Sequence, residues 1–160
     1  MSAIATTTVV PIEALPALRE AAAPRRSLLG RRKDEFPSAL ARYGRALELF
    51  EFSGFILVTV LEYLSGRGID LMQSQHDKVA SAISSARGST YVILGEEHRA
   101  LTPKLSDTQH SSVELAAFFN DMNGASEGLE VGEAMLDGIR FLRRALEAVT
   151  PGKVVLLTVL

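Results

Sequence analysis

The chain has 160 residues, of which 47% are hydrophobic, 22% charged and 6% aromatic. This length and composition are those of one ordinary globular domain, and they exclude a fibrous or wholly disordered protein. The sequence contains no cysteine, which excludes disulfides and thiolate metal sites and favours a cytoplasmic location. Residues 1–33 hold six basic and two acidic residues, whereas residues 34–160 hold 11 basic and 17 acidic ones. An acidic body argues against a nucleic-acid partner, because a nucleic-acid-binding domain usually presents a basic face.

Residues 1–33 are expected to form a flexible basic arm outside a single domain over residues 34–160. Pro11, Pro16 and Pro24 interrupt any helix in this region, because proline lacks the backbone donor that a helix needs. The start of the chain lacks the charged and apolar regions of a secretory signal. The longest uncharged apolar run, residues 52–61, is too short for the roughly 20 residues that span a bilayer. We therefore expect no membrane partner.

The arm contains the sequence RRSLLGRRK, in which two leucines lie between basic residues. This composition is typical of a docking peptide for a protein partner. The expected docking residues are Arg25, Arg26, Leu28, Leu29, Arg31 and Arg32. A solvated tail and a targeting or cargo peptide for a larger assembly are the alternatives.

The next segment predicts one long helix over residues 36–65. Its apolar positions alternate in steps of four and three, which is a heptad pattern: Phe36, Leu40, Tyr43, Leu47, Phe50, Gly54, Leu57, Leu61 and Leu64. Asp34 is placed to cap the start, and Gly66 or Gly68 to end the helix. Residues 52–61 are apolar on the other faces as well, so this half is expected to be surrounded by protein.

The remaining elements follow from caps, periodicity and β-propensity. They are a helix over 75–86, a strand over 89–94, a helix starting after Ser111, a helix over 127–149, a turn at Pro151 and Gly152, and a strand over 154–160. The predicted fold class is therefore α+β and mainly helical, with four helices in the order α-α-β-α-α-β and a small two-stranded sheet.

Glycines in the predicted helices indicate a close helix crossing. Gly128, Gly132 and Gly138 lie in one helix, although each interior glycine costs about 1 kcal/mol relative to alanine. Close approach of another backbone is the usual reason. Gly54 lies in the seam of the long helix, so we expect the two helices to cross near Gly54 and Gly132.

The two predicted strands favour a homodimer. Both are apolar on both faces, which is typical of strands covered on two sides. A two-stranded ribbon alone is marginally stable and leaves two open edges. Joining the ribbons of two copies would complete a four-stranded sheet. A monomer whose arm covers the edge and a permanent hetero-complex are alternatives, and the strand direction stays open.

The stretch GEEHR after the first strand holds the main candidates for chemistry. Glu96, Glu97 and His98 could supply a general base or ligands at the strand end, or they could be a solvated loop. His110 and Glu114 are four residues apart at a helix start and share one face. Together with His98 they offer a histidine and carboxylate set suited to zinc or iron(II), at a spacing that matches no established motif.

No other motif points to a reaction. The chain has no phosphate-binding loop, dinucleotide fingerprint, nucleophile elbow or zinc-protease motif, and no cofactor is expected. The preferred interpretation is a non-catalytic accessory, regulatory or inhibitor-like interaction module, homodimeric, with a basic docking arm. The alternative is a small enzyme or small-molecule binder with a carboxylate and histidine cleft at the strand ends. Whether the chain is an enzyme stays open.

Overall fold

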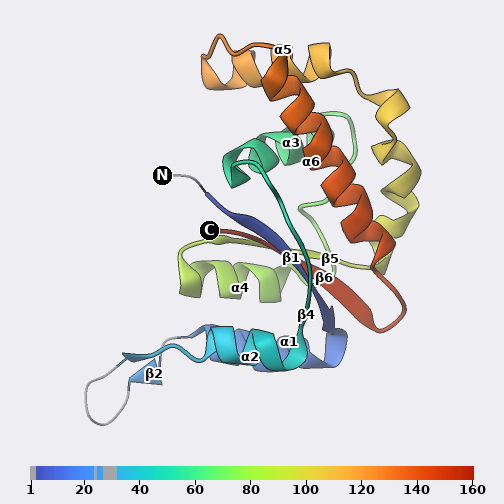
Figure 1. The fold of residues 1–160 in the computed structure, drawn as a ribbon. Helices are drawn as coiled ribbons and strands as arrows, with labels where there is room; N and C mark the ends of the chain where they lie inside the picture. Colours follow the sequence, from blue (N-terminus) through green and yellow to red (C-terminus); the bar gives the residue numbers. More distant parts are fainter. Residues whose placement is uncertain (1–2, 24, 27–31) are drawn as a thin grey trace.

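The centre of the molecule is a four-stranded antiparallel sheet (Figure 1). The computed structural model describes residues 3–23, 25–26 and 32–160. The strand order is β4-β1-β6-β5, and every neighbouring pair is antiparallel. These strands are β1 (Ala5–Pro11), β4 (Arg45–Leu49), β5 (Thr90–Leu94) and β6 (Lys153–Val159).

Six α-helices and a short second ribbon occupy the rest of the described chain. The helices are α1 (Leu15–Ala22), α2 (Phe36–Tyr43), α3 (Gly54–Gly66), α4 (Asp77–Arg87), α5 (Ser112–Asn123) and α6 (Leu129–Glu147). Three 3₁₀ segments are η1 (Ile12–Ala14), η2 (Glu96–Leu105) and η3 (Asp107–Gln109). The second ribbon pairs β2 (Arg25–Arg26) with β3 (Arg32–Lys33).

The sheet lies between two layers of helices (Figure 1). Alternate residues of a strand point to opposite faces. In β6, Val155 and Leu157 join the core formed with α3, α5 and α6, whereas Val154 and Leu156 join the core formed with α1, α2 and α4. Burial on both faces explains why β5 and β6 carry apolar residues on both faces.

The structure confirms an α+β fold and the elements predicted after residue 74. It corrects the expected element order and the two-stranded sheet, because β1 and β4 were not foreseen. Since all four strands come from one chain, no second copy is needed to complete the sheet. The strand direction, left open above, is antiparallel.

The expectation of a flexible arm over residues 1–33 is wrong for residues 5–22. β1 is an inner strand, paired with β4 on one side and β6 on the other. η1 and α1 follow, and Leu15 and Leu18 are buried. The prolines are tolerated because Pro11 ends a strand and Pro16 lies in the first turn of a helix. The domain therefore includes these residues.

The predicted helix over residues 36–65 is three elements, α2, β4 and α3. The chain leaves α2 at Gly44, whose backbone is extended. A Cβ at Gly44 would lie 2.5 Å from the Thr8 side chain and 2.7 Å from the Leu40 carbonyl oxygen. The heptad spacing continued through residues 45–49, but these residues pair with β1 instead. Pairing of that strand outweighed the local helical pattern.

The predicted crossing of Gly54 and Gly132 is also wrong. A Cβ at Gly54 would meet Val159 and Ala3, and one at Gly132 would overlap the backbone of Ser112 at the start of α5. The glycine of α6 that faces α3 is Gly138, where a Cβ would lie 3.0 Å from the Val60 side chain. The close contact expected from the glycines exists, with α5 as the partner of Gly132.

Asp34 ties α2 to α4. Its carboxylate accepts a hydrogen bond from the Phe36 backbone N–H. It also forms an ion pair with Arg87 at 2.7 Å. The hydrogen bond from Arg87 is the main cause that lowers the pKa of Asp34 below its ordinary value of 3.8. A carboxyl whose pKa is lower in the folded than in the unfolded chain stabilises the fold at pH values above its unfolded pKa. This contribution disappears as the pH falls through the folded pKa.

Asp34→Asn should therefore lower the melting temperature at pH 7, with the difference from the unmodified chain shrinking as the pH falls below about 4. Melting curves followed by circular dichroism between about pH 7 and pH 2 measure this. Asp121→Asn, at an exposed position of α5, is the control and should leave the pH profile unchanged. A difference that stays constant down to the lowest pH would contradict the ion pair.

Candidate functional site

His98 is a buried structural residue. Its side chain is 2% exposed. The Gly95 backbone N–H donates to Nδ1 at 3.0 Å, and Nε2 lies 2.7 Å from the Gln73 carbonyl oxygen. A backbone N–H can only donate, so Nδ1 is the acceptor and the proton is on Nε2, which donates to Gln73. Both ring nitrogens are thus used to hold backbone groups.

The two glutamates of GEEHR are not arranged as a catalytic pair. The Glu97 carboxylate accepts hydrogen bonds from the backbone and side-chain nitrogens of Gln75, at 3.0 and 3.4 Å. Partial burial raises the pKa of Glu97. Hydrogen bonds from the backbone N–H groups of Gln75 and of Glu97 itself lower it by more, so the pKa of Glu97 is below its ordinary value. A lowered pKa suits an ionised anchor better than a general base near neutral pH. Glu96 is exposed on the surface of η2.

His110 and Glu114 do not join His98. His110 is 7% exposed, and its Nε2 donates to the Lys104 carbonyl oxygen at 2.8 Å. Glu114 lies on the surface and pairs with Arg67 at 3.4 Å. Within residues 3–23, 25–26 and 32–160, no group of three His, Asp or Glu side chains is placed to hold a metal. The three candidate ligands His98, His110 and Glu114 therefore do not converge.

These residues instead anchor the connection between α3 and α4. His98 holds the Gln73 carbonyl and Glu97 holds the Gln75 backbone. The same connection contributes Leu71, 1% exposed, to the core next to β5. GEEHR is thus the place where a buried strand leaves the core and fixes a neighbouring loop.

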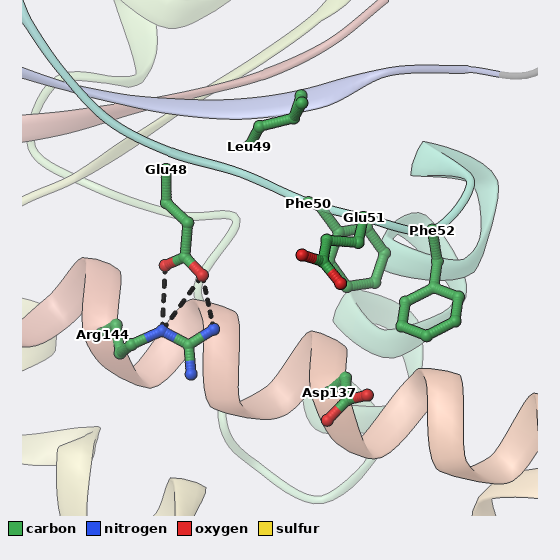
Figure 2. A pocket seen from close by; sticks show the side chains of 7 residues that line it. All are labelled: Glu48, Leu49, Phe50, Glu51, Phe52, Asp137 and Arg144. Atoms are coloured by element: carbon green, nitrogen blue, oxygen red, sulfur yellow. Dashed lines mark hydrogen bonds and ion pairs between the residues drawn. The ribbon is translucent and has the colours of Figure 1, made fainter.

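A cleft lies between α6 and the connection from β4 to α3 (Figure 2). Its volume is about 330 Å³. The lining residues are Glu48, Leu49, Phe50, Glu51, Phe52, Asp137 and Arg144. The cleft combines an aromatic side wall with three carboxylates and one guanidinium.

Ion pairs occupy part of this cleft. Figure 2 shows the Arg144 guanidinium against the Glu48 carboxylate, with contacts of 2.6 and 2.9 Å. The hydrogen bonds that Arg144 donates to the Glu48 carboxylate raise the pKa of Arg144. Asp137 pairs with Arg140, whereas no cation of the described part of the chain pairs with Glu51. The cleft therefore has a negative character and suits a cationic group.

β2 and β3 pair in a short ribbon beyond the ends of α1 and α2, and we call this ribbon the hairpin (Figure 1). Arg25 lies opposite Lys33, and Arg26 lies opposite Arg32. Of the predicted docking residues, Leu28, Leu29 and Arg31 lie outside the residues that the structure describes. The backbone pairing therefore brings four basic residues together in one short ribbon.

Sequence reasoning missed the cleft and the register of the hairpin. Glu48 and Arg144 are 96 residues apart, and no local pattern relates them. The hairpin had one signal, a basic repeat on both sides of Leu28, Leu29 and Gly30, which permits a turn. That segment was expected to be an arm without regular structure.

Comparisons with known proteins do not assign this chain to a family. No protein family, curated protein or solved structure matches this chain. In the described residues, no helix combines the length and the apolar character needed to cross a membrane.

Proposed function

We propose that this chain is a non-catalytic protein–protein interaction module, of accessory, regulatory or inhibitor-like type, that docks through its basic hairpin and acts as a homodimer. The observation that carries the proposal is the pairing of Arg25 with Lys33 and of Arg26 with Arg32. A ribbon that carries four basic residues suits a partner with an acidic surface, because complementary charge guides and orients association.

The placement of the candidate catalytic groups supports this proposal. His98 and Glu97 are hydrogen-bonded to backbone groups of one loop, and His110 is hydrogen-bonded to Lys104. These bonds give each group a structural role. A protein partner with an acidic face, a cytoplasmic location and no nucleic-acid or membrane partner belong to the same proposal.

The hairpin is tested by reversing its described charges. A variant with Arg25→Glu, Arg26→Glu, Arg32→Glu and Lys33→Glu is compared with the unmodified chain in affinity purification after crosslinking in its source cells. We expect an acidic protein, a second copy included, to be recovered with the unmodified chain and to be reduced at least tenfold with the variant, as for lost charge pairing (about 1.4 kcal/mol per tenfold).

The matched control reverses four exposed basic residues of the body: Lys78, Arg99, Lys104 and Lys153. This control has the same net charge as the hairpin variant and should recover the partner fully. Equal recovery with both variants would contradict docking through the hairpin. So would a mobility shift of DNA or RNA that depends on the hairpin, because it would assign the charge to nucleic acid.

A second candidate function, small-molecule binding, is favoured by the cleft in Figure 2. Its chemistry, with Glu51 and Asp137 near Phe52, would select an organic cation. Glu51→Gln combined with Asp137→Asn should then abolish binding of such a ligand, as measured by calorimetry. An unchanged affinity would exclude the cleft as the site.

A further inference from the structure

The two edges of the central sheet differ in what covers them. At the β5 edge, the Ser84 hydroxyl of α4 accepts a hydrogen bond from the Tyr91 N–H and donates one to the Tyr91 carbonyl oxygen. This side chain thus bonds backbone groups that a further strand would otherwise bond. β4 forms the other edge, where Arg45, Ala46 and Leu49 are exposed. No strand of the described chain pairs with β4 on the side away from β1, so this edge is open.

The backbone groups that β4 directs outward follow from the hydrogen-bond pattern of β1. In an antiparallel pair, every second pair of opposite residues exchanges both backbone hydrogen bonds. Because Ile4 and Leu160 exchange both bonds, the even-numbered residues of β1 bond β6. Ala46 and Leu49 lie opposite even-numbered residues of β1, so their own N–H and C=O groups point away from β1. The bulge in this pairing places Ala46 and Leu49 opposite residues that are two apart, so their outward groups are spaced as in a regular strand.

The charges along this edge make β4 complementary to itself. Arg45 begins the strand, and Glu51 follows shortly after its end (Figure 2). Both side chains are exposed, and neither forms an ion pair with a described residue. Antiparallel pairing of two β4 strands places the basic start of each beside the acidic end of the other, whereas parallel pairing would oppose like charges. Glu48, which would lie near the axis of such a pair, is already neutralised by Arg144.

We propose that the β4 strands of two copies of this chain pair antiparallel about a two-fold axis and join the two four-stranded sheets into one. Ala46 of each copy exchanges backbone hydrogen bonds with Leu49 of the other, and the exposed Leu49 side chain packs beside that Ala46. Arg45 of each copy lies next to Glu51 of the other, so the second copy supplies the cation for the negative cleft. This inference rests on the proposed function, since it gives the homodimer its interface.

Disulfide cross-linking tests this register, because the chain has no cysteine of its own. One full-length variant carries Ala46→Cys and the other carries Leu49→Cys. After air oxidation, an equimolar mixture should give a covalent dimer with one chain of each kind, because these positions lie directly opposite one another. Each variant alone should cross-link at least about fivefold less, because identical positions are only diagonal neighbours. A mixture of Ala46→Cys with Met72→Cys, at a 43% exposed residue outside β4, is the control and should give no covalent dimer.

Sedimentation equilibrium of charge-reversed variants tests the complementarity. Arg45→Glu and Glu51→Arg should each raise the dissociation constant of the dimer at least about tenfold, because both of its charge contacts become repulsive. The double variant should restore the dissociation constant of the unmodified chain, because it only exchanges the two charges. Arg99→Glu and Glu96→Arg, at exposed positions of η2, are the matched controls and should leave the dissociation constant unchanged. Circular dichroism of each variant separates loss of the dimer from loss of the fold.

A monomeric unmodified chain would overturn the inference. So would a dimer in which the mixture of Ala46→Cys and Leu49→Cys cross-links no better than its control, because the two copies then meet elsewhere; the homodimer of the proposed function would stand. If the chain is monomeric but the hairpin variant still loses an acidic protein in affinity purification, docking through the hairpin stands without self-association. If neither self-association nor hairpin-dependent recovery is seen, the proposed function fails as well.

Discussion

Gly132→Ala is expected to lower the free energy of unfolding by about 3 kcal/mol, because overpacking a closely packed contact costs roughly 1–3 kcal/mol and occasionally more. A Cβ at this position would overlap the Ser112 carbonyl oxygen and lie 2.8 Å from the carbonyl carbon. These are backbone atoms at the start of α5, so a change of side-chain rotamer cannot relieve the overlap. The two helices would have to separate. With a total stability of about 5–15 kcal/mol, Gly132→Leu should not fold.

Urea unfolding followed by circular dichroism measures this loss. The control is Gly66→Ala, because Gly66 is the last residue of α3 and a Cβ there would meet nothing within 4 Å. This control should be neutral or gain up to about 1 kcal/mol from reduced entropy of the unfolded chain. If Gly132→Ala were as stable as the unmodified chain, the described packing of α5 on α6 would be incorrect.

His98→Ala is expected to lower the free energy of unfolding by about 2–4 kcal/mol while partner binding is kept at 25 °C. The substitution removes the partners of the Gly95 N–H and the Gln73 carbonyl. The buried Gly95 N–H left without an acceptor costs about 1–3 kcal/mol. Loss of the buried imidazole adds the cost of the cavity that it leaves. Binding should survive, because the hairpin lies outside this region. Thermal unfolding and the affinity purification described above measure the two effects.

His76→Ala is the matched control, because Nε2 of His76 has no hydrogen-bond partner among the described residues. Its effect should be within about 0.5 kcal/mol, as for substitutions that break no specific interaction. An unchanged stability of His98→Ala, together with loss of a bound ligand or an activity, would make GEEHR a functional site. That result would favour the alternative enzyme interpretation.

The elements after residue 74 could be predicted because their local signals agree. Asp77 accepts from the Ser74 N–H at the start of α4, and Gly88 and Gly124 end α4 and α5 in left-handed conformations. Gly152 has a φ of +76° in the turn before β6. In these segments the caps, the periodicity and the tertiary environment favour the same structure.

The first half was mispredicted because the deciding contacts are distant in the sequence. The segment TTTVV has high β-propensity, but it is stable as a strand only when β4 and β6 pair on its two sides. Residues 45–49 fit a helical heptad as well as a strand, and pairing with β1 decides between them. Averaging charge and proline content over residues 1–33 concealed a strand, a helix and a hairpin.

The same limit applies to the candidate site. Glu96, Glu97 and His98 were correctly located at a strand end, but their hydrogen bonds to residues 73 and 75 depend on the loop between α3 and α4. The cleft joins Glu48 and Arg144, which are 96 residues apart in the sequence. Sequence spacing does not encode such neighbours.

Native mass spectrometry of the full chain tests the central claim most directly, because it reports subunit number and bound mass together. An interaction module of the proposed kind should appear as a dimer of the bare chain, with no additional mass. A monomer that retains a metal ion or a small organic molecule would contradict the proposal and identify the chain as a small-molecule binder or an enzyme.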